Sequence, residues 1–247
     1  MAKAKAGTPD TKKKLPEIVI INATILGTSA LLLNPATEEL LESLRTKVSI
    51  ARDRTLSRDE EAANKLIRGA DGKTLIIPIE YMLSSLIEAG RHVDFKPRTK
   101  VSTKLSTMLY SFMFGYPTEL LLTDGAGGDP EYRADFRRGR NPKDGVMVAL
   151  VRPRFDNWGF NVSFKVRTNK IDPSKVRELF EISGSMVGLG DFRPSCRGPF
   201  GCFGVLKWEM KDVDGNLVGK EEVSTSTTAS EPEASMESAD IAEPVLA

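Results

Sequence analysis

Histidine and cysteine are scarce in this sequence: it has one histidine, His92, and two cysteines, Cys196 and Cys202, in 247 residues. A single histidine excludes a multi-histidine metal site and leaves only one position for a histidine-based triad. Two cysteines cannot form a disulfide framework, and the five residues between them do not match the spacing of a zinc knuckle. We therefore expect no metal, no cofactor and no catalytic residue.

Net charge and long apolar runs are also missing. Lys and Arg number 35 against 34 for Asp and Glu, so the chain is neither strongly basic nor strongly acidic. No segment approaches the roughly 20 apolar residues of a membrane span, and the basic N-terminus is not followed by a small-residue cleavage site. The sequence therefore predicts a cytoplasmic protein without a membrane partner.

The two ends of the chain differ from its middle. Residues 1–16 are small, polar and basic, whereas residues 221–247 are acidic and rich in Ser, Thr, Glu and Pro. Segments of this composition bury too little apolar surface to order themselves. We predict a disordered basic N-terminal tail over 1–16, a folded domain over 17–220 that is more basic than the whole chain, and a disordered acidic tail over 221–247.

Hydrophobic periodicity within the folded part predicts alternating strands and helices. Residues 158–167 alternate between apolar and polar side chains, and Asp172-Pro173 is typical of a helix start. We expect 146–151 and 158–167 to pair as a hairpin, with a turn at 153–157, and we assign no order to 95–144. The other expected elements are a strand over 18–26, a helix over 36–48, a helix over 57–68, a strand over 74–77, a helix from Pro78, a helix ending at Gly184 and a strand over 203–210.

This order of elements predicts the α+β class, with a βαββαβ core of the ferredoxin-like (RRM-like) type. The segment at about 50–144 would be a large insertion between the first helix and the second strand. A glycine-rich loop, GLGDFRPSCRGPFGCF at 188–203, precedes the last strand. Glycines allow backbone amides to face an anion, and guanidinium groups fit phosphate oxygens. The candidate binding residues here are Gly188, Gly190, Arg193, Arg197 and Gly201.

A second basic segment, residues 133–143, holds five basic residues against one acidic residue in eleven positions. A loop of this kind would follow a nucleic-acid backbone by its charge, while an aromatic side chain at the hairpin turn would stack on a base. The candidate residues in the segment are Arg133, Arg137, Arg138, Arg140 and Lys143. Those of the hairpin are Arg152, Arg154, Phe155, Trp158, Lys165 and Arg167. A solvated charged surface is the plainer interpretation of both sets.

Three blocks of sequence resemble the RAMP superfamily, the modified RNA-recognition folds that include the backbone subunits of CRISPR effector complexes. The blocks are GTSALLLNP, DGKTLIIPIEYMLSSLIEAG and VRPRFDNWGFNVSFKV, the last followed by GLGDFRP and FGCFGV. They are most similar to phage and prophage proteins of this RAMP-like type. The resemblance implies binding of single-stranded nucleic acid by a filament of subunits, in the bacterial host cytoplasm if the protein is phage-encoded. Cys202 and Pro199 depart from a plain Gly/Arg-rich loop.

The expected function is therefore non-catalytic, largely sequence-independent binding of single-stranded RNA or DNA by an oligomer or filament. The acidic tail would compete with nucleic acid or bind a protein partner. One alternative is an assembly protein that associates with itself and binds no nucleic acid. Another is a metal-independent endoribonuclease that uses His92 as a general base. Asp124, Asp129 and Asp135 are conceivable metal ligands, but Asp-Gly and Asp-Pro pairs are first of all turn formers.

Overall fold

The computed structural model describes residues 15–48, 55–140 and 145–222, and most of both predicted tails lies outside these ranges. The elements, in chain order, are β1 Ile18–Gly27, β2 Leu31–Leu32, α1 Glu38–Thr46, α2 Arg58–Ala63, β3 Ile76–Pro78, α3 Ile79–Ala89, β4 Asp94–Lys96, β5 Thr99–Lys100, α4 Leu109–Phe112, β6 Met113–Tyr116, β7 Glu119–Leu121, β8 Arg133–Arg140, β9 Met147–Phe155, β10 Gly159–Arg167, α5 Pro173–Ile182, a π-helical turn Ser183–Val187, a 3-10 turn Pro194–Cys196, β11 Phe203–Lys211 and β12 Leu217–Glu222. The strand β12 was not predicted, and it extends two residues into the predicted C-terminal tail.

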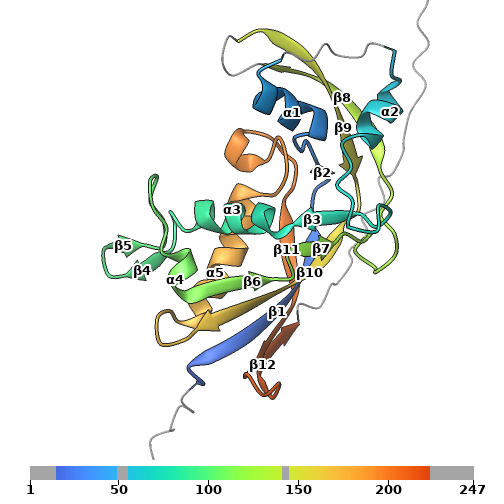
Figure 1. Cartoon of the computed structure of the whole chain (residues 1–247). Coiled ribbons are helices and arrows are strands. Elements are labelled where there is room, and N and C mark those ends of the chain that lie inside the picture. The colour runs from blue at the N-terminus through green and yellow to red at the C-terminus, as the bar shows by residue number, and fades with distance from the viewer. Residues whose placement is uncertain (1–14, 49–54, 141–144, 223–247) are drawn as a thin grey trace, which may run out of the picture.

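The central sheet has the strand order β12-β11-β1-β10-β6, and every neighbouring pair is antiparallel. Helices α3 and α5 pack against each other and lie on the same side of this sheet (Figure 1). The alternating side chains of β1 and β10 that face the helices are buried, as the period of two predicts for a sheet covered on one face. The α+β class predicted from the sequence is confirmed.

Aromatic rings hold the centre of the core. Phe180 of α5 contacts Phe164 of β10 and Trp208 of β11 edge-to-face, with ring centroids 5.4 and 5.1 Å apart. The Asp172 carboxylate caps α5 by accepting the Ser174 amide, and Pro173 occupies the first turn. The predicted start of this helix is therefore confirmed.

The predicted hairpin between 146–151 and 158–167 is wrong. The strand β10 pairs with β1 and β6, while β9 pairs with β8 and β2 in a separate three-stranded sheet. The predicted turn at 153–157 starts too early, because Pro153 lies within β9 and its carbonyl accepts the Leu33 amide at 3.2 Å. The proline is tolerated there because β2 pairs with β9 only at Arg154 and Phe155, so Pro153 lies beyond that short ladder.

Within the described residues, no helix is long and apolar enough to span a membrane. The helix α1 makes few contacts with the remaining elements and leaves several leucines exposed. It lies at the end of the molecule away from β12 (Figure 1).

Candidate nucleic-acid interface

The basic segment 133–143 is a strand, β8, over Arg133–Arg140, so the predicted loop is wrong over that range. It pairs with β9 to form a twisted ribbon, called here the basic hairpin. Arg133 lies opposite Arg154, and Asp135 lies opposite Arg152. Arg140 ends the strand, but its side chain is outside the described part of the structure, as is the whole of Lys143.

The glycine loop, residues 188–202, packs against the chain's own backbone. Gly188, Gly190 and Gly201 have φ values of 77°, 72° and 74°. A Cβ on Gly190 would lie 2.3 Å from the Leu32 carbonyl oxygen. The glycines are therefore required for the close approach of two backbone segments.

The amides of this loop already have acceptors within the protein. The Gly188 amide donates to the Ser183 carbonyl at 2.7 Å, and the Gly201 amide donates to the Ala30 carbonyl at 2.8 Å. The prediction that these two amides face a phosphate is wrong, because both are used to hold the loop on its neighbours. The loop is a rigid element of the fold whose side chains remain available.

A buried ion network joins the hairpin to the glycine loop. The Arg152 guanidinium is 4 % exposed and donates to Asp191 at 2.8 Å, and it lies 3.5 Å from Asp135. Asp135 also accepts from Arg137 at 2.8 Å. Arg152 Nε has no hydrogen-bond partner within the described residues. The predicted role of Arg152 in contacting phosphate is wrong, because its charge is buried between two carboxylates.

Phe155 and Trp158 are buried in the core, so neither stacks on a base as predicted. The Trp158 indole donates from Nε1 to the Ser29 carbonyl at 2.7 Å, and its ring lies 6.1 Å from that of Phe160. These residues were predicted to stack because of their place at a hairpin turn, but that hairpin does not form and both side chains pack in the core.

Carboxylates also neutralise several of the other predicted arginines. Arg133 and Arg154 both pair with Asp156, at 3.0 and 2.6 Å, and Arg193 pairs with Glu88 at 3.4 Å. In the described ranges, Arg138 and Arg197 have no ion pair. Exposed ion pairs are weak, so Arg133 is still able to leave Asp156 and contact an anion. Arg138 and Arg197 carry charge that no described carboxylate compensates.

A cleft of about 530 Å³ lies between the basic hairpin and the glycine loop. The Phe192 ring, half-buried in the wall of this cleft, lies 6.0 Å from the Phe200 ring, and the Arg137 guanidinium stacks 4.6 Å above Phe200. The cleft thus combines cationic groups with an aromatic face. Its lining residues are Arg137, Arg138, Gly139, Met147, Leu150, Arg152, Asp191, Phe192 and Cys196.

A second cleft, of about 360 Å³, lies on the other side of Asp191 and is lined by Tyr81, Ser84, Gly188, Gly190 and Arg193 among others. Burial, and secondarily the negative charge of Asp191, raises the pKa of the Tyr81 hydroxyl. The Tyr81 hydroxyl therefore stays protonated and is able to donate a hydrogen bond. The glycine loop separates two adjacent clefts, and sequence reasoning identified neither Tyr81 nor Phe192.

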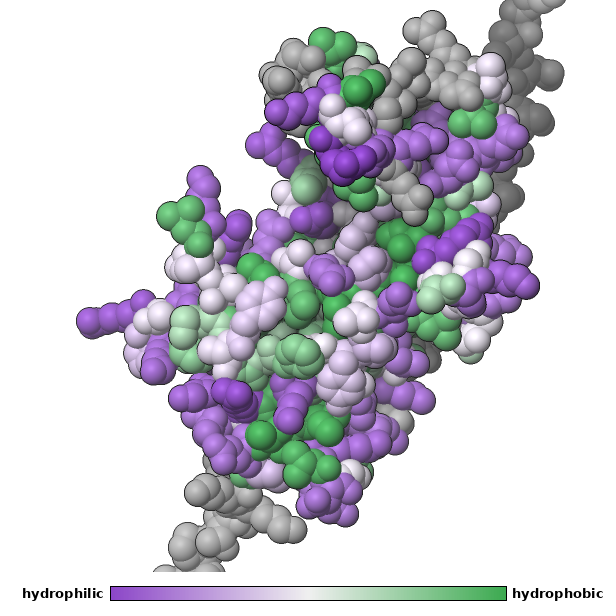
Figure 2. Space-filling model, in the orientation of Figure 1, coloured by the Kyte–Doolittle hydropathy of each residue, from purple (hydrophilic) through white to green (hydrophobic). Residues whose placement is uncertain are grey.

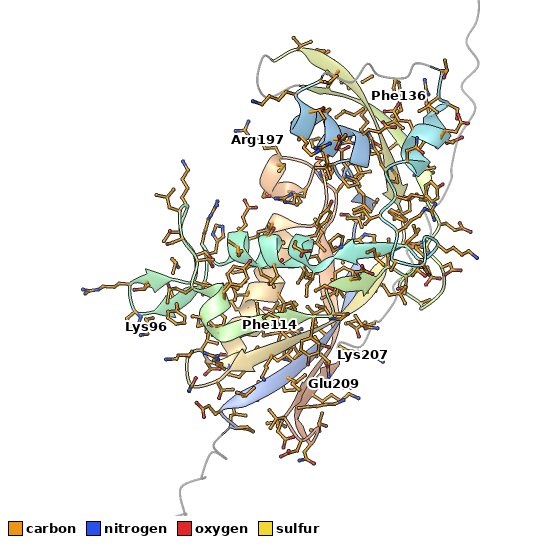
Figure 3. The ribbon with its side chains drawn as sticks, viewed as in Figure 1. Lys96, Phe114, Phe136, Arg197, Lys207 and Glu209 are labelled. Carbon is orange, nitrogen blue, oxygen red and sulfur yellow. The ribbon has the colours of Figure 1, made fainter. Side chains whose placement is uncertain are left out.

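Lys165 and Arg167 are not part of the hairpin surface, contrary to prediction. They lie on β10, where Arg167 is opposite Ile18 at the start of β1. The glycine loop contacts Ser29 and Ala30, just past the other end of β1. At about 3.3 Å per residue the two surfaces are roughly 30 Å apart along the strand. Figure 3 shows Arg197 and Phe136 at one end of the molecule and Phe114 near the other.

The residues considered for catalysis or metal binding are dispersed. His92 is exposed in the turn after α3 and lines neither cleft. Asp124 accepts the amides of Ala126 and Gly128, both at 2.8 Å, and these hydrogen bonds, with Gly128 the larger contributor, lower the pKa of its carboxyl group. Asp124 therefore acts as a turn former. No cluster of three or more metal-ligating side chains occurs in the part of the chain that the structure describes.

Comparisons with known proteins give similarities to solved structures and none in sequence. No protein-family model matches the chain, and no curated protein sequence matches it. The solved structures that match include a chain from the cryo-EM structure of the type III-B Cmr-beta complex bound to cognate target RNA. The two chains are 14 % identical and superpose with a TM-score of 0.40 over 78 % of this chain. This chain spans 61 % of the length of that one.

Proposed function

We propose that the protein binds single-stranded RNA or DNA without catalysis and largely without sequence preference. The observation that carries the proposal is the cleft between the basic hairpin and the glycine loop. Arg138 of the hairpin and Phe192 of the glycine loop both line this cleft, and Arg197 is exposed on the same loop as Phe192. Cations that follow a phosphate backbone, with rings that stack on bases, are the usual components of single-strand binding.

The strand connections favour a ferredoxin-like, RAMP-like core of the βαββαβ type for this function. Strands β1 and β6 are both antiparallel to β10, which lies between them, and α3 connects them along the chain. Strands β10 and β11 are related in the same way through β1 and α5. We assign the two interleaved units to the split βαβ plan, with β6 as its second strand in place of the predicted 146–151.

Phosphate contacts are expected from the exposed cations, with the aromatic face of Phe192 contacting bases. Binding would take place in the cytoplasm, which is the bacterial host cytoplasm if the protein is phage-encoded. Because neither phosphate contact nor stacking depends on the 2′-hydroxyl, this mode of binding accepts both RNA and DNA.

The double variant Arg138→Gln/Arg197→Gln tests this cleft. Each phosphate neutralised on a single strand contributes about 0.7 to the slope of log K against log salt, so the slope should fall by about 1.4. The control variant Lys73→Gln/Lys104→Gln removes the same charge from two exposed lysines that line neither cleft. Equal slopes for the two variants, measured by fluorescence anisotropy with a labelled oligonucleotide, would place binding elsewhere.

The acidic tail is expected to compete with nucleic acid. Deleting 223–247, which leaves β12 intact, removes five carboxylates and no basic residue. Affinity for a single strand should rise, most strongly at low salt where the interaction between tail and cleft is least screened. Unchanged affinity at low salt would reject competition and leave the tail as a docking segment for a protein partner.

Self-association is part of the proposal, and it is supported by the apolar face of α1. Leu40, Leu41 and Leu44 are exposed on this helix, Leu44 to 67 %. Figure 2 shows hydrophobic residues among the polar ones at this end of the molecule. Clusters of exposed apolar side chains are typical of contacts between proteins.

The variant Leu44→Glu should therefore reduce the mass measured by light scattering, because a buried unpaired carboxylate opposes the contact. Leu105→Glu is the matched control, since Leu105 is 95 % exposed in a loop distant in sequence from α1. If assemblies persist in Leu44→Glu, the contact surface is not α1. If the protein also binds no nucleic acid, the alternative of a purely structural assembly protein gains support.

A further inference from the structure

An exposed thiol, that of Cys196, lies in the wall of the cleft between the basic hairpin and the glycine loop. Cys196 ends the 3-10 turn Pro194–Cys196, and its amide donates to the Arg193 carbonyl at 2.8 Å. The Arg197 amide donates to the Pro194 carbonyl at 2.9 Å, which closes the turn. Cys196 forms no disulfide. The turn therefore holds a free thiol at a fixed place, where a reagent that enters the cleft is able to reach it.

The walls around this thiol are cationic. Arg137, Arg138 and Arg152 line the cleft, and Asp191 is the one carboxylate among its described lining residues. Both oxygens of Asp191 are already used, because Oδ2 accepts from Arg152 and Oδ1 accepts from the Phe192 amide, each at 2.8 Å. Arg138 is exposed and has no ion pair within the described ranges. The cleft therefore attracts small anions toward the thiol.

A buried donor in the same wall lacks an acceptor. Arg152 lines the cleft with its side chain only 4 % exposed, yet its Nε has no hydrogen-bond partner among the described residues. Buried polar atoms are normally hydrogen-bonded, so the unpaired Nε indicates that an acceptor is missing from this wall. A carboxylate bound in the cleft would supply that acceptor. This observation is independent of the charge count, and both indicate an anionic ligand.

We propose that Cys196 is a modification site, where the thiol forms a mixed disulfide with an anionic low-molecular-weight disulfide such as glutathione disulfide. The Cys196 thiolate attacks one sulfur of the small disulfide. A bond forms between Sγ and that sulfur, the original S–S bond breaks, and the other half leaves as a thiolate that takes up a proton. The protein thiol is oxidised and the small disulfide is reduced, so the step needs no further oxidant.

The attached group matches the cleft in size and charge. The cleft of about 530 Å³ is within the range of volumes that hold small ligands. The carboxylates of a glutathionyl group would contact Arg138 and supply the acceptor for Arg152, while Met147 and Leu150 would contact its methylene groups. Since these carboxylates neutralise cations that phosphate contact requires, the modification would also block the cleft to nucleic acid. The blocking rests on the proposed function, but the modification does not.

Mass spectrometry of the full-length protein after incubation with glutathione disulfide tests the site. We expect one glutathionyl group per chain, on the peptide that contains Cys196. The variant Cys196→Ser should lose this modification, and Cys202→Ser should keep it, because Cys202 is less exposed and its amide is bonded to Ser29.

The rate of modification separates this site from any accessible thiol. Arg138→Gln should slow the reaction with glutathione disulfide roughly 5-fold, and it should leave the reaction with the neutral bis(2-hydroxyethyl) disulfide nearly unchanged. Lys104→Gln is the control, because it removes the same charge from an exposed lysine that does not line the cleft, and it should slow neither reaction.

Fluorescence anisotropy with a labelled oligothymidine measures the effect on binding. The modified protein should bind at least roughly 10-fold more weakly, because the added carboxylates repel phosphates in the same cleft. Reduction with dithiothreitol should restore the affinity. The affinity of Cys196→Ser should be the same before and after treatment with glutathione disulfide.

Each contrary outcome decides a separate question. Absence of the modification, equal modification of Cys196 and Cys202, or a rate that Arg138→Gln does not change would overturn the modification site. Modification without loss of affinity would overturn the blocking of the cleft. If the unmodified protein binds no oligonucleotide, the proposed function fails and the blocking fails with it, while the mass spectra still decide whether Cys196 is the modified residue.

Discussion

Replacing Arg152 by alanine is expected to lower the free energy of unfolding by about 3–5 kcal/mol. The guanidinium is buried and lies between Asp135 of β8 and Asp191 of the glycine loop. Its removal leaves Asp135 buried with only the partly exposed Arg137 as counter-charge. The loss comes mainly from the uncompensated buried carboxylate rather than from the lost attraction alone.

The neighbouring variant Arg154→Ala is the control, because it removes the same charge from the same strand. Arg154 pairs with an exposed carboxylate, Asp156, and is itself partly exposed. Exposed pairs of this kind contribute at most about 1 kcal/mol. Chemical denaturation of both variants measures the difference. Equal stabilities would contradict the structural role of the Asp135–Arg152–Asp191 network.

A second large loss of stability is expected when Gly201 is replaced. A Cβ there would lie 1.9 Å from the Leu189 carbonyl oxygen, and the residue has φ +74°. The left-handed conformation costs a residue with a side chain about 1–2 kcal/mol, and forced packing typically adds about 1–3 kcal/mol. Gly201→Ala should therefore lose about 3 kcal/mol or more of stability, and it should open the contact between the loop and Ala30.

Gly204→Ala provides the comparison three residues further along. A Cβ at Gly204 meets only Thr28 at 3.9 Å, and its φ is not positive. A thermal unfolding scan should give a clearly lower midpoint for Gly201→Ala and a nearly unchanged one for Gly204→Ala. If both variants melt like the wild type, the glycine loop is not the close-packed element described above.

Local structure was predictable where the signal lies within one segment. The alternation of β10, the Asp172-Pro173 start of α5 and the apolar pattern of β1 all correspond to observed elements. Strand pairing was not predictable in the same way. β10 pairs with β1, about 140 residues earlier in the chain, and periodicity contains no information about which strand becomes a neighbour. The prediction paired β10 with the strand nearest in sequence.

The ion pairs of the candidate site were not predictable from the sequence either. Sequence identified Arg152, Arg154 and Arg193 as cations. Arg154 pairs with Asp156, only two residues away, but Arg152 and Arg193 pair with Asp191 and Glu88, which come from distant parts of the chain. Charge counting cannot show this, because pairing depends on tertiary packing. Phe155 and Trp158 illustrate a related error, since aromatic residues next to arginines are as common in a core as at an interface.

The exposed strand β6 was missed for a different reason. It has four residues and lies in the segment 95–144, where short apolar pieces alternate with turns. Such runs do not distinguish strands from irregular structure. The antiparallel pairing with β10 shows that this strand is the edge of the central sheet.

The most direct test of the account is a salt titration of binding, with the full-length protein and labelled single-stranded RNA, single-stranded DNA and duplex of one length. We expect both single strands to bind more tightly than the duplex. Their affinity should fall steeply and linearly in log–log form as salt increases, because each neutralised phosphate releases counterions. Absence of binding to any of the three, or an affinity for single strands that salt does not change, would contradict the proposed nucleic-acid interface.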